Sequence, residues 1–485
     1  MSDDEPAGGY TFDQARWSDD DGYVPLLSET SGQTAEPGDA LPDDLTRDSL
    51  ALPAPAEPTL VRHYTRLSEL NYGVDSGPYP LGSCTMKFNP SFTEDVAALP
   101  GAAVHPDRPD ETVQGVLELQ HRLQDYLARV GGMDAVTLQP PAGAAGEFTG
   151  IEVAKAFHRA NGEGETRSEV LIPSSAHGTN FATASMAGYE VVELPPADDG
   201  RLDLDALEAT VSEETAALML TNPNTVGLFE RDVTAAADLV HDAGGLLYYD
   251  GANLNALLGR ARPGDMGFDV MHYNVHKTFA TPHGGGGPGA GPVGVVADLA
   301  PFLPTPHVRE ADGGYETYEP AQSIGKVHGY AGNWLVLVKA YAYLARLGDE
   351  GLLDTSATAV LNANYLAEQV DLAVPYGPFH HEFAATAGDR DAADLAKAML
   401  DHGVHPPTTK WPEFVDEAML TEPTEAETKR ELDALAAAFN AAAAASDEAL
   451  AAAPERTAAR RIDQVGAARE PRLSWHALGD EPGAE

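Results

Sequence analysis

Cysteine is almost absent from this sequence. Cys84 is the one cysteine among 485 residues. A single cysteine can form no intrachain disulfide, and it cannot supply a site that needs several thiolate ligands. We therefore expect neither a disulfide framework nor a cysteine-based metal centre, and we predict an active site without a metal.

Long apolar segments are missing as well. No uninterrupted apolar run reaches the roughly 20 residues that a helix needs to span a bilayer. The first ten residues, MSDDEPAGGY, are acidic and are not followed by the apolar core of a signal peptide. We therefore expect a soluble, cytoplasmic protein that does not insert into a membrane.

Positive charge is the third scarcity. The chain has 30 Lys and Arg residues against 76 Asp and Glu residues, so its formal net charge is −46. Nucleic acids and anionic membranes attract basic surfaces, which excludes both as the main partner. Because the acidic residues are spread along the chain and not gathered in tails, the composition favours a halophilic protein from a cytoplasm of high salt.

The chain divides into regions of different pattern. Residues 1–60 are rich in Asp, Glu, Pro and Gly and predict an extended or weakly ordered arm. Residues 61–134 form an N-terminal segment, in which 112–130 predict an amphipathic helix that Gly131 and Gly132 close. Its expected apolar face consists of Val116, Leu119, Leu123 and Leu127.

Between residues 135 and 330, short apolar runs alternate with helical stretches. Strands are expected at 169–173, 189–194, 216–221, 245–250 and 269–274. This alternation predicts an α/β domain around a mostly parallel sheet. Residues 331–445 predict a smaller C-terminal α+β domain, and the alanine-rich, acidic residues 446–485 predict an exposed helix with a frayed tail.

Two charged residues follow successive expected strands. Asp250 ends the strand 245–250, and Lys277 lies just past the strand 269–274, next to His276. Open α/β sheets bind ligands at the carboxyl ends of their strands. Pyridoxal 5'-phosphate (PLP) needs a lysine for a Schiff base and an acid beside its pyridine nitrogen. The pair therefore indicates a PLP site; the alternative is that Asp250 caps a helix and Lys277 is a surface cation.

Three further segments are compatible with the same ligand. A turn of small residues at 141–146 precedes an expected helix, whose N–H groups can hold a phosphate. His177 follows the strand 169–173 and can lie over the face of the cofactor ring, although a structural histidine is equally compatible with this position. The glycine-rich run from residue 284 lacks the Lys-Ser/Thr of a P-loop, so it is either a flexible turn or a backbone close to the cofactor.

Several of these motifs together resemble one known family. The segments 79–87 (YPLGSCTMK), 250–256 (DGANLNA) and 276–288 (HKTFATPHGGGGP) are similar to glycine dehydrogenase (decarboxylating), the P-protein of the glycine cleavage system, in the second subunit of its split form. Segments 175–180 and 221–230 extend the resemblance, which covers about residues 60–440. Ala145 and Phe181 depart from the family pattern, in which a larger polar residue and a proline are usual.

The resemblance implies a PLP enzyme with the aspartate-aminotransferase fold (fold type I) and a Schiff base at Lys277. The expected catalytic residues are Lys277, Asp250 and His177. The expected cofactor contacts are these three together with Gly143, Ala144, Ala145, Thr221, Asn253, Asn274 and His276. The substrate or entry loop is expected to comprise Ser83, Cys84, Thr85 and Lys87. For Cys84 we predict a packed or loop thiol without a redox role.

The implied reaction decarboxylates glycine and transfers the aminomethyl group to the lipoyl arm of the H-protein. The implied partners are that protein and the first subunit of the enzyme, in an α2β2 heterotetramer. Another fold type I PLP enzyme, such as an amino-acid decarboxylase or a cysteine desulfurase, would use a lysine and an aspartate in the same roles as Lys277 and Asp250. Such an enzyme would not explain the sequence of the loop at 83–87. A non-catalytic structural subunit is a further alternative, against which the Lys277 and Asp250 pair argues.

We expect the protein to lose structure as salt is removed. The Debye length, over which repulsion among its carboxylates decays, is ~3 Å at molar salt and ~30 Å at 0.01 M. Repulsion is therefore much stronger in dilute buffer. Activity, size and circular dichroism, followed from molar potassium chloride down to tens of millimolar, test this expectation. A chain that keeps its oligomeric state, activity and melting temperature throughout would show that its acidity is not a salt adaptation.

Overall fold

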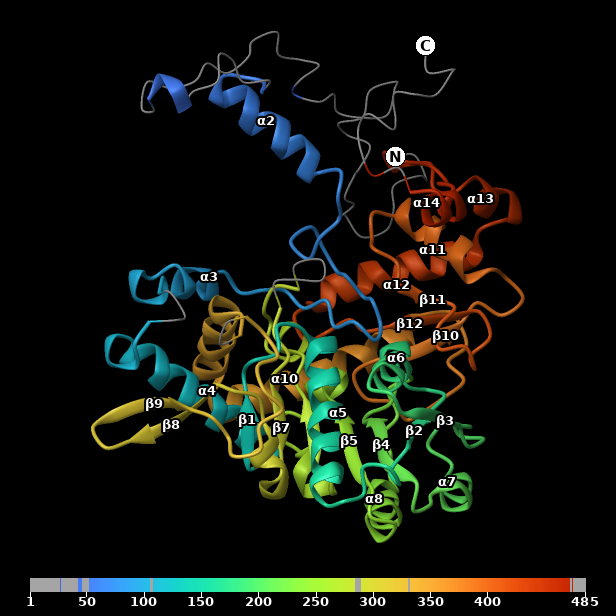
Figure 1. The fold of residues 1–485 in the computed structure, drawn as a ribbon. Helices are drawn as coiled ribbons and strands as arrows, with labels where there is room; N and C mark the ends of the chain where they lie inside the picture. Colours follow the sequence, from blue (N-terminus) through green and yellow to red (C-terminus); the bar gives the residue numbers. More distant parts are fainter. Residues whose placement is uncertain are drawn as a thin grey trace.

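The computed structural model describes residues 52–104, 108–283, 289–329 and 332–471, together with residues 27, 42–45 and 473. Most of the arm predicted at 1–60 lies outside these described residues. Helix α2 (Glu57–Ser68) buries none of its residues, and Figure 1 shows it standing away from the body of the chain.

A seven-stranded sheet forms the centre of the larger domain (Figure 1). Only β7 runs against the other strands, so the predicted mostly parallel sheet is confirmed. In spatial order its strands are β1 (Ala135–Thr137), β7 (Val293–Val295), β6 (Val270–His272), β5 (Leu246–Asp250), β4 (Thr215–Thr221), β2 (Glu169–Pro173) and β3 (Glu190–Leu194). The expected strand at 269–274 is shorter than predicted, because the chain turns into a helix after Asn274.

Side chains of the central strands alternate between two cores. In β5, Leu247 and Tyr249 join one apolar cluster, while Leu246 and Tyr248 join the cluster on the opposite face. This period of two buries both faces of the sheet, and helices cover each of them. The helices around the sheet are α4 (Gln114–Gly131), α5 (Gly143–Ala160), α6 (Gly178–Met186), α7 (Leu204–Thr210), α8 (Val233–Asp242) and α9 (Val275–Thr278).

Helix α4 is the amphipathic helix predicted at 112–130, and it ends at Gly132 in the left-handed conformation (φ 72°). Leu123 and Leu127 are buried as expected, but Val116 and Leu119 are only half-buried. The buried stripe instead includes Leu117, Gln120 and Gln124. The prediction was wrong about part of this face because it counted only apolar residues. Gln124 is buried, and its side-chain amide donates a hydrogen bond to the Val308 carbonyl.

A smaller sheet lies toward the carboxyl ends of β2, β4 and β5 (Figure 1). It consists of β10 (Phe383–Thr386), β12 (Ala418–Thr421) and β11 (Thr408–Thr409), all antiparallel. Helices α11 (Ala392–Leu400) and α12 (Lys429–Ala444) pack with it around an apolar core that contains Leu395 and Phe439. Further elements are α3 (Ser91–Ala97), the hairpin of β8 (His307–Ala311) and β9 (Gly314–Tyr318), and α14 (Gln464–Arg469).

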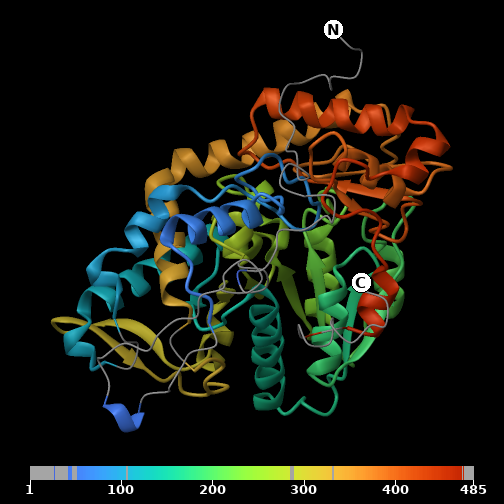
Figure 2. The same ribbon diagram turned by 90° about the horizontal axis from the view of Figure 1, so that it is seen from above.

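The long helix α10 (Trp334–Gln369) joins the two domains, as Figure 2 shows from above. Its first half packs Leu337 and Leu344 into the large core, and its second half packs Ala363 and Leu366 into the small core. Gly348, with φ 61°, interrupts the helix between these halves. The division predicted near residue 330 therefore precedes a helix that belongs to both cores.

The tail predicted from residue 446 begins with packed structure. Helix α13 (Asp447–Ala452) starts at Ser446, whose side chain accepts a hydrogen bond from the Ala449 N–H. Leu450 and Ala453 are buried in the small-domain core, so this core extends past residue 445.

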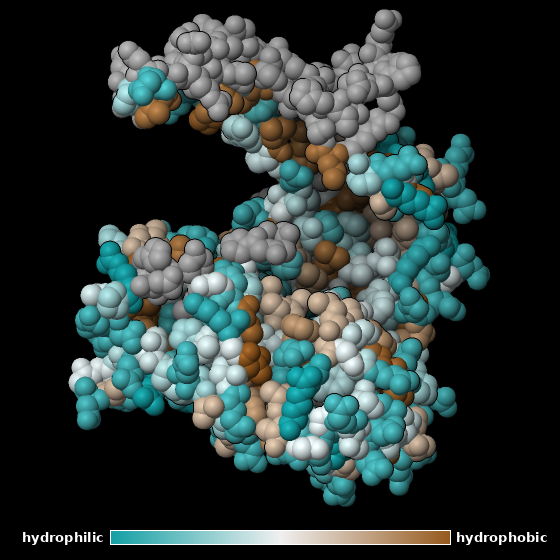
Figure 3. Space-filling view, in the orientation of Figure 1, coloured by the Kyte–Doolittle hydropathy of each residue, from teal (hydrophilic) through white to brown (hydrophobic). Residues whose placement is uncertain are grey.

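Hydrophilic residues cover most of the face shown in Figure 3, as expected for a chain with a net charge of −46. Within the described part of the chain, no helix combines the length and the apolarity that a membrane span needs.

Candidate active site

A cavity of about 320 Å³ lies where the predicted site residues meet. Its wall is built from the carboxyl ends of β5 and β6, the first turns of α5, α6 and α9, and the loop at 83–84. The lining residues are Ser83, Cys84, Ala142, Gly143, Ala144, Glu147, His177, Thr179, Asp250, Ala252, His272, Asn274, His276, Lys277, His283 and Gly289. The structure therefore brings together Asp250, Lys277 and His177, which the sequence places 100 residues apart along the chain from first to last.

Asp250 ends β5 and is 3% exposed, so its carboxylate is almost completely removed from water. Asn180 donates its side-chain amide to Oδ2 at 3.1 Å, and the Ala252 N–H donates to Oδ1 at 3.0 Å. His272 Nε2 lies 3.3 Å from Oδ1. Burial alone would raise the pKa of Asp250, but His272, Lys277 and these hydrogen bonds outweigh it and hold the pKa below its usual value. Asp250 is thus a buried carboxylate kept ionised.

Lys277 lies in α9, the short helix that follows β6. Strand β6 pairs with β5, the strand that ends at Asp250. Its Nζ donates a hydrogen bond to the Ser83 carbonyl at 2.9 Å. The side chain is only half-buried, so its amine is accessible from the cavity that it lines. An amine and a carboxylate on neighbouring strand ends can contact opposite sides of one flat ligand.

The N-terminus of α5 faces the same cavity. Gly143 and Ala144 line it, and no side chain caps the N–H groups of the first turn. A Cβ at Gly143 would collide with the Asn274 side chain, so the backbone approaches the cavity only because residue 143 is glycine. Free N–H groups at the positive end of a helix dipole are suited to a phosphate.

Four histidines line the cavity, namely His177, His272, His276 and His283. His177 caps α6, and its Nδ1 lies 2.8 Å from the Thr179 hydroxyl. Burial and the Lys277 ammonium lower the pKa of His276 to about 3, and its Nδ1 has no hydrogen-bond partner among the described residues. The protein atoms around His177, together with Lys277, also lower the pKa of that ring, so both imidazoles are neutral near pH 7.

Glu147 is a cavity residue that sequence reasoning missed as a functional group. It is 2% exposed, and its Oε1 has no hydrogen-bond partner in the described part of the chain. Burial, and then the negative charge of Asp250, raise the pKa of Glu147 to about 7. Its place near the start of helix α5 offered the only signal, because a carboxylate there is common without any function.

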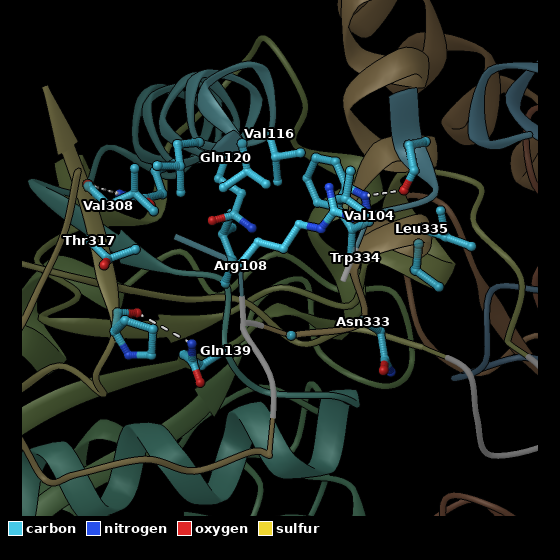
Figure 4. Close-up of a pocket in the computed structure, with 18 of the residues that line it drawn as sticks. Val104, Arg108, Val116, Gln120, Gln139, Val308, Thr317, Asn333, Trp334 and Leu335 are labelled. Atoms are coloured by element: carbon cyan, nitrogen blue, oxygen red, sulfur yellow. Dashed lines mark hydrogen bonds between the residues drawn. The ribbon is translucent and has the colours of Figure 1, made fainter. Parts of the chain in front are cut away.

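Figure 4 shows a second cavity, of about 740 Å³. Val104, Val116 and Trp334 are among the residues that line it. Asn333 also lines it, and its side-chain amide donates to the carbonyls of Pro141 and Gly289. Lys339 is the one lysine among its lining residues, and it is paired with Glu94 at 2.5 Å. This larger cavity therefore lacks an accessible amine opposite a carboxylate.

Comparison with known proteins decides the family. A protein from Halobacterium salinarum, described as a probable glycine dehydrogenase (decarboxylating) subunit 2, is 70% identical over 96% of this chain and 99% of its own length. A protein of the same description from Pyrococcus horikoshii is 51% identical over 90% of each chain. The chain belongs to the family of glycine dehydrogenase (decarboxylating) subunit 2.

Family models and solved structures agree with this assignment. Residues 355–459 match the C-terminal domain of glycine dehydrogenase, and residues 150–286 match aminotransferase class V. A solved glycine decarboxylase (P-protein) of the glycine cleavage system has a TM-score of 0.70 at 24% identity, covering 83% of this chain and 93% of that chain. A cysteine desulfurase from Escherichia coli has a TM-score of 0.57 at 19% identity over 76% and 95%. The predicted fold class, fold type I, is confirmed.

Some residues predicted to contact the cofactor do not line the cavity. Ala145 and Thr221 are not among its lining residues, and Thr221 is buried with its hydroxyl unpartnered in the described structure. Asn253 instead donates its amide to the Pro223 carbonyl at 2.8 Å and to Glu382 Oε1 at 2.9 Å. Their roles toward a cofactor stay predictions. The glycine-rich run at 284–288 lies outside the described residues.

The loop expected at the entrance divides into two faces. Ser83 and Cys84 line the cavity, but Thr85 and Lys87 turn toward the small domain. Thr85 donates to Glu422 at 2.6 Å, and buried Lys87 pairs with Glu425 at 2.6 Å. Lys87 also donates to Asn255 and to the Thr278 carbonyl. Thr85 and Lys87 are therefore bound within the protein and do not face a ligand.

The thiol of Cys84 is largely enclosed. Burial raises its pKa, which the Lys277 ammonium only partly offsets, so the thiol stays protonated near pH 7. The role of Cys84 as a packed or loop thiol stays a prediction.

We expect Glu147→Gln to remove a pH-dependent loss of stability. With its pKa raised to about 7, Glu147 keeps its proton in the folded chain over a range where the same group in the unfolded chain, with an ordinary pKa of 4.5, has lost it. The folded state therefore binds more protons between these two values, and wild-type stability falls as pH rises through them, by at most about 3 kcal/mol. Urea unfolding of the cofactor-free chain, in constant molar salt, should show the variant gaining on wild type across this window.

Glu152→Gln is the matched control, since Glu152 is half-buried on the same helix. It should leave the pH dependence close to that of wild type. A constant stability difference between Glu147→Gln and wild type from about pH 4.5 to about pH 7 would contradict the raised pKa.

Proposed function

We propose that this chain decarboxylates glycine with PLP and transfers the aminomethyl group to the lipoyl arm of an H-protein. The observation that carries the proposal is the pair of Asp250 and Lys277, on neighbouring strand ends of one cavity, in a chain of this family. When bound, PLP supplies an electron sink for the electron pair that is released as carbon dioxide leaves.

The residues of the cavity fit PLP on three counts. Lys277 offers a primary amine for the aldehyde carbon, and Asp250 offers a buried, ionised acceptor for a protonated pyridine nitrogen. The uncapped start of α5, at Gly143 and Ala144, offers N–H groups for the phosphate. These three groups come from separate elements around one cavity of about 320 Å³.

Asp250 holds the proton on the ring nitrogen. Its carboxylate is ionised and has little water to compensate its charge, so a pyridinium is its natural counter-ion. Asn180 and the Ala252 N–H fix the orientation of the carboxylate. A ring nitrogen that keeps its proton draws electron density more strongly than a neutral one.

Lys277 is placed to move protons once glycine has taken its position. Its flexible stem is only half-buried, and Ser83 gives its amine a fixed hydrogen-bond acceptor at one end of its range. Neutral His177 lines the same cavity and offers a flat face to a bound ring. We assign both residues a catalytic role on these grounds.

The partners follow from the same assignment. The relatives carry the designation subunit 2, and we propose that this chain likewise pairs with a first subunit, in an α2β2 heterotetramer. Helix α2 supports a protein partner, because it exposes Val61 and Tyr64 by 56% and 59% and buries no residue against its own chain. The lipoyl arm would reach the cavity past Ser83 and Cys84. We place the reaction in the cytoplasm.

The release of carbon dioxide from carboxyl-labelled glycine tests the proposal. The chain, with its partner subunit, PLP and lipoylated H-protein, should release label in proportion to the aminomethyl group found on the lipoyl arm. An amino-acid decarboxylase would release carbon dioxide from another amino acid without the lipoyl acceptor, and a cysteine desulfurase would release sulfur from cysteine. Either result would refute the proposal, as would a chain that binds no PLP.

We expect Asp250→Asn to lower the rate of decarboxylation by roughly a thousandfold, because the neutral amide cannot hold a proton on the ring nitrogen. Single-turnover measurements with saturating PLP separate this loss from weaker cofactor binding. Asp265→Asn is the control, since Asp265 is exposed and paired with Arg262. Near-normal turnover in Asp250→Asn would mean that another acid, of which Glu147 is the nearest in the cavity wall, supports the ring.

A further inference from the structure

Three glutamates of the small domain hold alternate residues of the loop at 83–87. Glu382 accepts the Ser83 N–H at 2.8 Å, Glu422 accepts the Thr85 hydroxyl, and Glu425 pairs with Lys87. Ser83 and Cys84 line the cavity, while the Thr85 and Lys87 side chains are bound by glutamates outside it. The loop is therefore bound along one edge by the small domain while its other edge forms the cavity wall.

Glu382 differs from the other two glutamates in what it binds. It is 0% exposed, and both of its carboxyl oxygens accept hydrogen bonds. Oε2 accepts from the Ser83 backbone and Oε1 accepts from the Asn253 side chain. Glu422, which is equally buried, accepts only from Thr85 at Oε1, and its Oε2 has no partner among the described residues.

The two donors to Glu382 lead directly to the two central residues of the site. The Ser83 carbonyl accepts the hydrogen bond from Lys277 Nζ. Asn253 lies in the 3-10 helix η5 (Gly251–Ala256), which follows Asp250. The Ala252 N–H of the same helix donates to the Asp250 carboxylate. Glu382 thus contacts one segment that holds Lys277 and another that holds Asp250.

The backbone conformation of Ser83 requires stabilising contacts. Its φ of 62° lies in the left-handed region, which is unfavourable for a residue other than glycine. Gly82 donates to the Leu420 carbonyl and accepts from Thr408, so the loop stays attached to the small sheet on the other side of Ser83. The bond to Glu382 is the one described contact that fixes the Ser83 N–H itself.

Titratable side chains lie on both sides of Glu382. His381 and Glu422 lie next to it, and Lys277 lies across the loop. Burial lowers the pKa of His381 to about 3, so the imidazole is neutral and adds no counter-charge. Burial and Glu422 raise the pKa of Glu382, while Ser83, Lys277 and Asn253 oppose that rise. In either protonation state, the bonds from Ser83 and Asn253 need two acceptor oxygens.

We propose that Glu382 is a positioning residue for the reaction: by accepting from Ser83 and Asn253 at once, it fixes the carbonyl that binds Lys277 relative to the turn that holds Asp250. This inference rests on the proposed function for its effect on the rate, but not for its effect on the loop. Glu382 touches neither cavity, so it acts through Ser83 and Asn253 alone. It also makes the alignment of Lys277 and Asp250 depend on the position of the small domain.

Glu382→Gln tests the proposal, because an amide offers one acceptor where the carboxyl group offers two. Hydrogen exchange of the full chain without cofactor, read by mass spectrometry, should show roughly tenfold faster exchange in a peptide that covers 82–86. In the assembled, PLP-loaded enzyme, kcat should fall roughly tenfold or more while KM for glycine stays within about twofold. A merely structural role would instead lower the melting temperature without this local exchange and without the split between kcat and KM.

Glu422→Gln is the matched control. Its amide oxygen can still accept from Thr85, and its amide nitrogen replaces an oxygen that has no described partner. Exchange at 82–86 and kcat should therefore stay near wild type. Where Glu382→Gln does not fold, Glu382→Asp serves instead, because it keeps the carboxyl group but is one methylene too short to reach both donors.

The proposal would be overturned if Glu382→Gln kept the hydrogen-exchange rate and the kcat of the wild type. It would also be overturned if Glu382→Gln and Glu422→Gln changed both quantities equally. Failure of the wild-type chain to release carbon dioxide from glycine would refute the proposed function and leave the exchange comparison standing. The two ideas therefore fail by different measurements.

Discussion

The site depends on a negative charge that is kept inside the protein. Asp250 is almost fully buried at the end of a central strand, yet its pKa lies below the usual value. Removing an ion from water costs several kcal/mol unless other groups replace the solvent. Asn180, the Ala252 N–H, His272 and Lys277 do so in part, and each comes from a different element. The arrangement of strand ends around the cavity is therefore also the arrangement that stabilises this charge.

A second layer of polar contacts connects that site to the small domain. Buried Glu382 and Glu422 and half-buried Glu425 bind the loop at 83–87, and the loop in turn contacts Lys277. Such groups are expensive to bury, and each is offset by a donor from another segment. The two domains also share α10, whose two halves pack into the two cores on either side of Gly348. The family's cofactor chemistry thus rests on contacts that span most of the chain.

Much of the fold follows from local sequence patterns. Five expected strands occur within a few residues of their predicted places, because buried parallel strands are short apolar runs between turns. The pairing of Asp250 with Lys277 was also predictable, since both follow strands and strand ends share one edge of a sheet. The apolar stripe of α4 was predicted less well, because a glutamine whose amide finds a carbonyl can be buried like a leucine.

The residues that support the site could not be found in this way. Glu382 and Glu422 are far along the chain from Ser83 and Thr85, and nothing in their local sequence distinguishes them from the other 74 acidic residues among the 76 in the chain. Asn253 and Lys87 were singled out by their motifs, but only tertiary structure shows that their partners are protein groups. Glu147 was hidden for a similar reason, as its raised pKa arises from burial and then from Asp250, and both depend on the tertiary structure.

The central claim is that Lys277 and Asp250 together hold the cofactor. Borohydride reduction of the PLP-loaded chain, followed by peptide mapping, tests it most directly, because reduction fixes the cofactor to the amine that binds it. The account predicts one pyridoxyl group, on Lys277, together with loss of the visible absorption band of the bound cofactor. A pyridoxyl group on Lys87 or on any other of the eight lysines would contradict it.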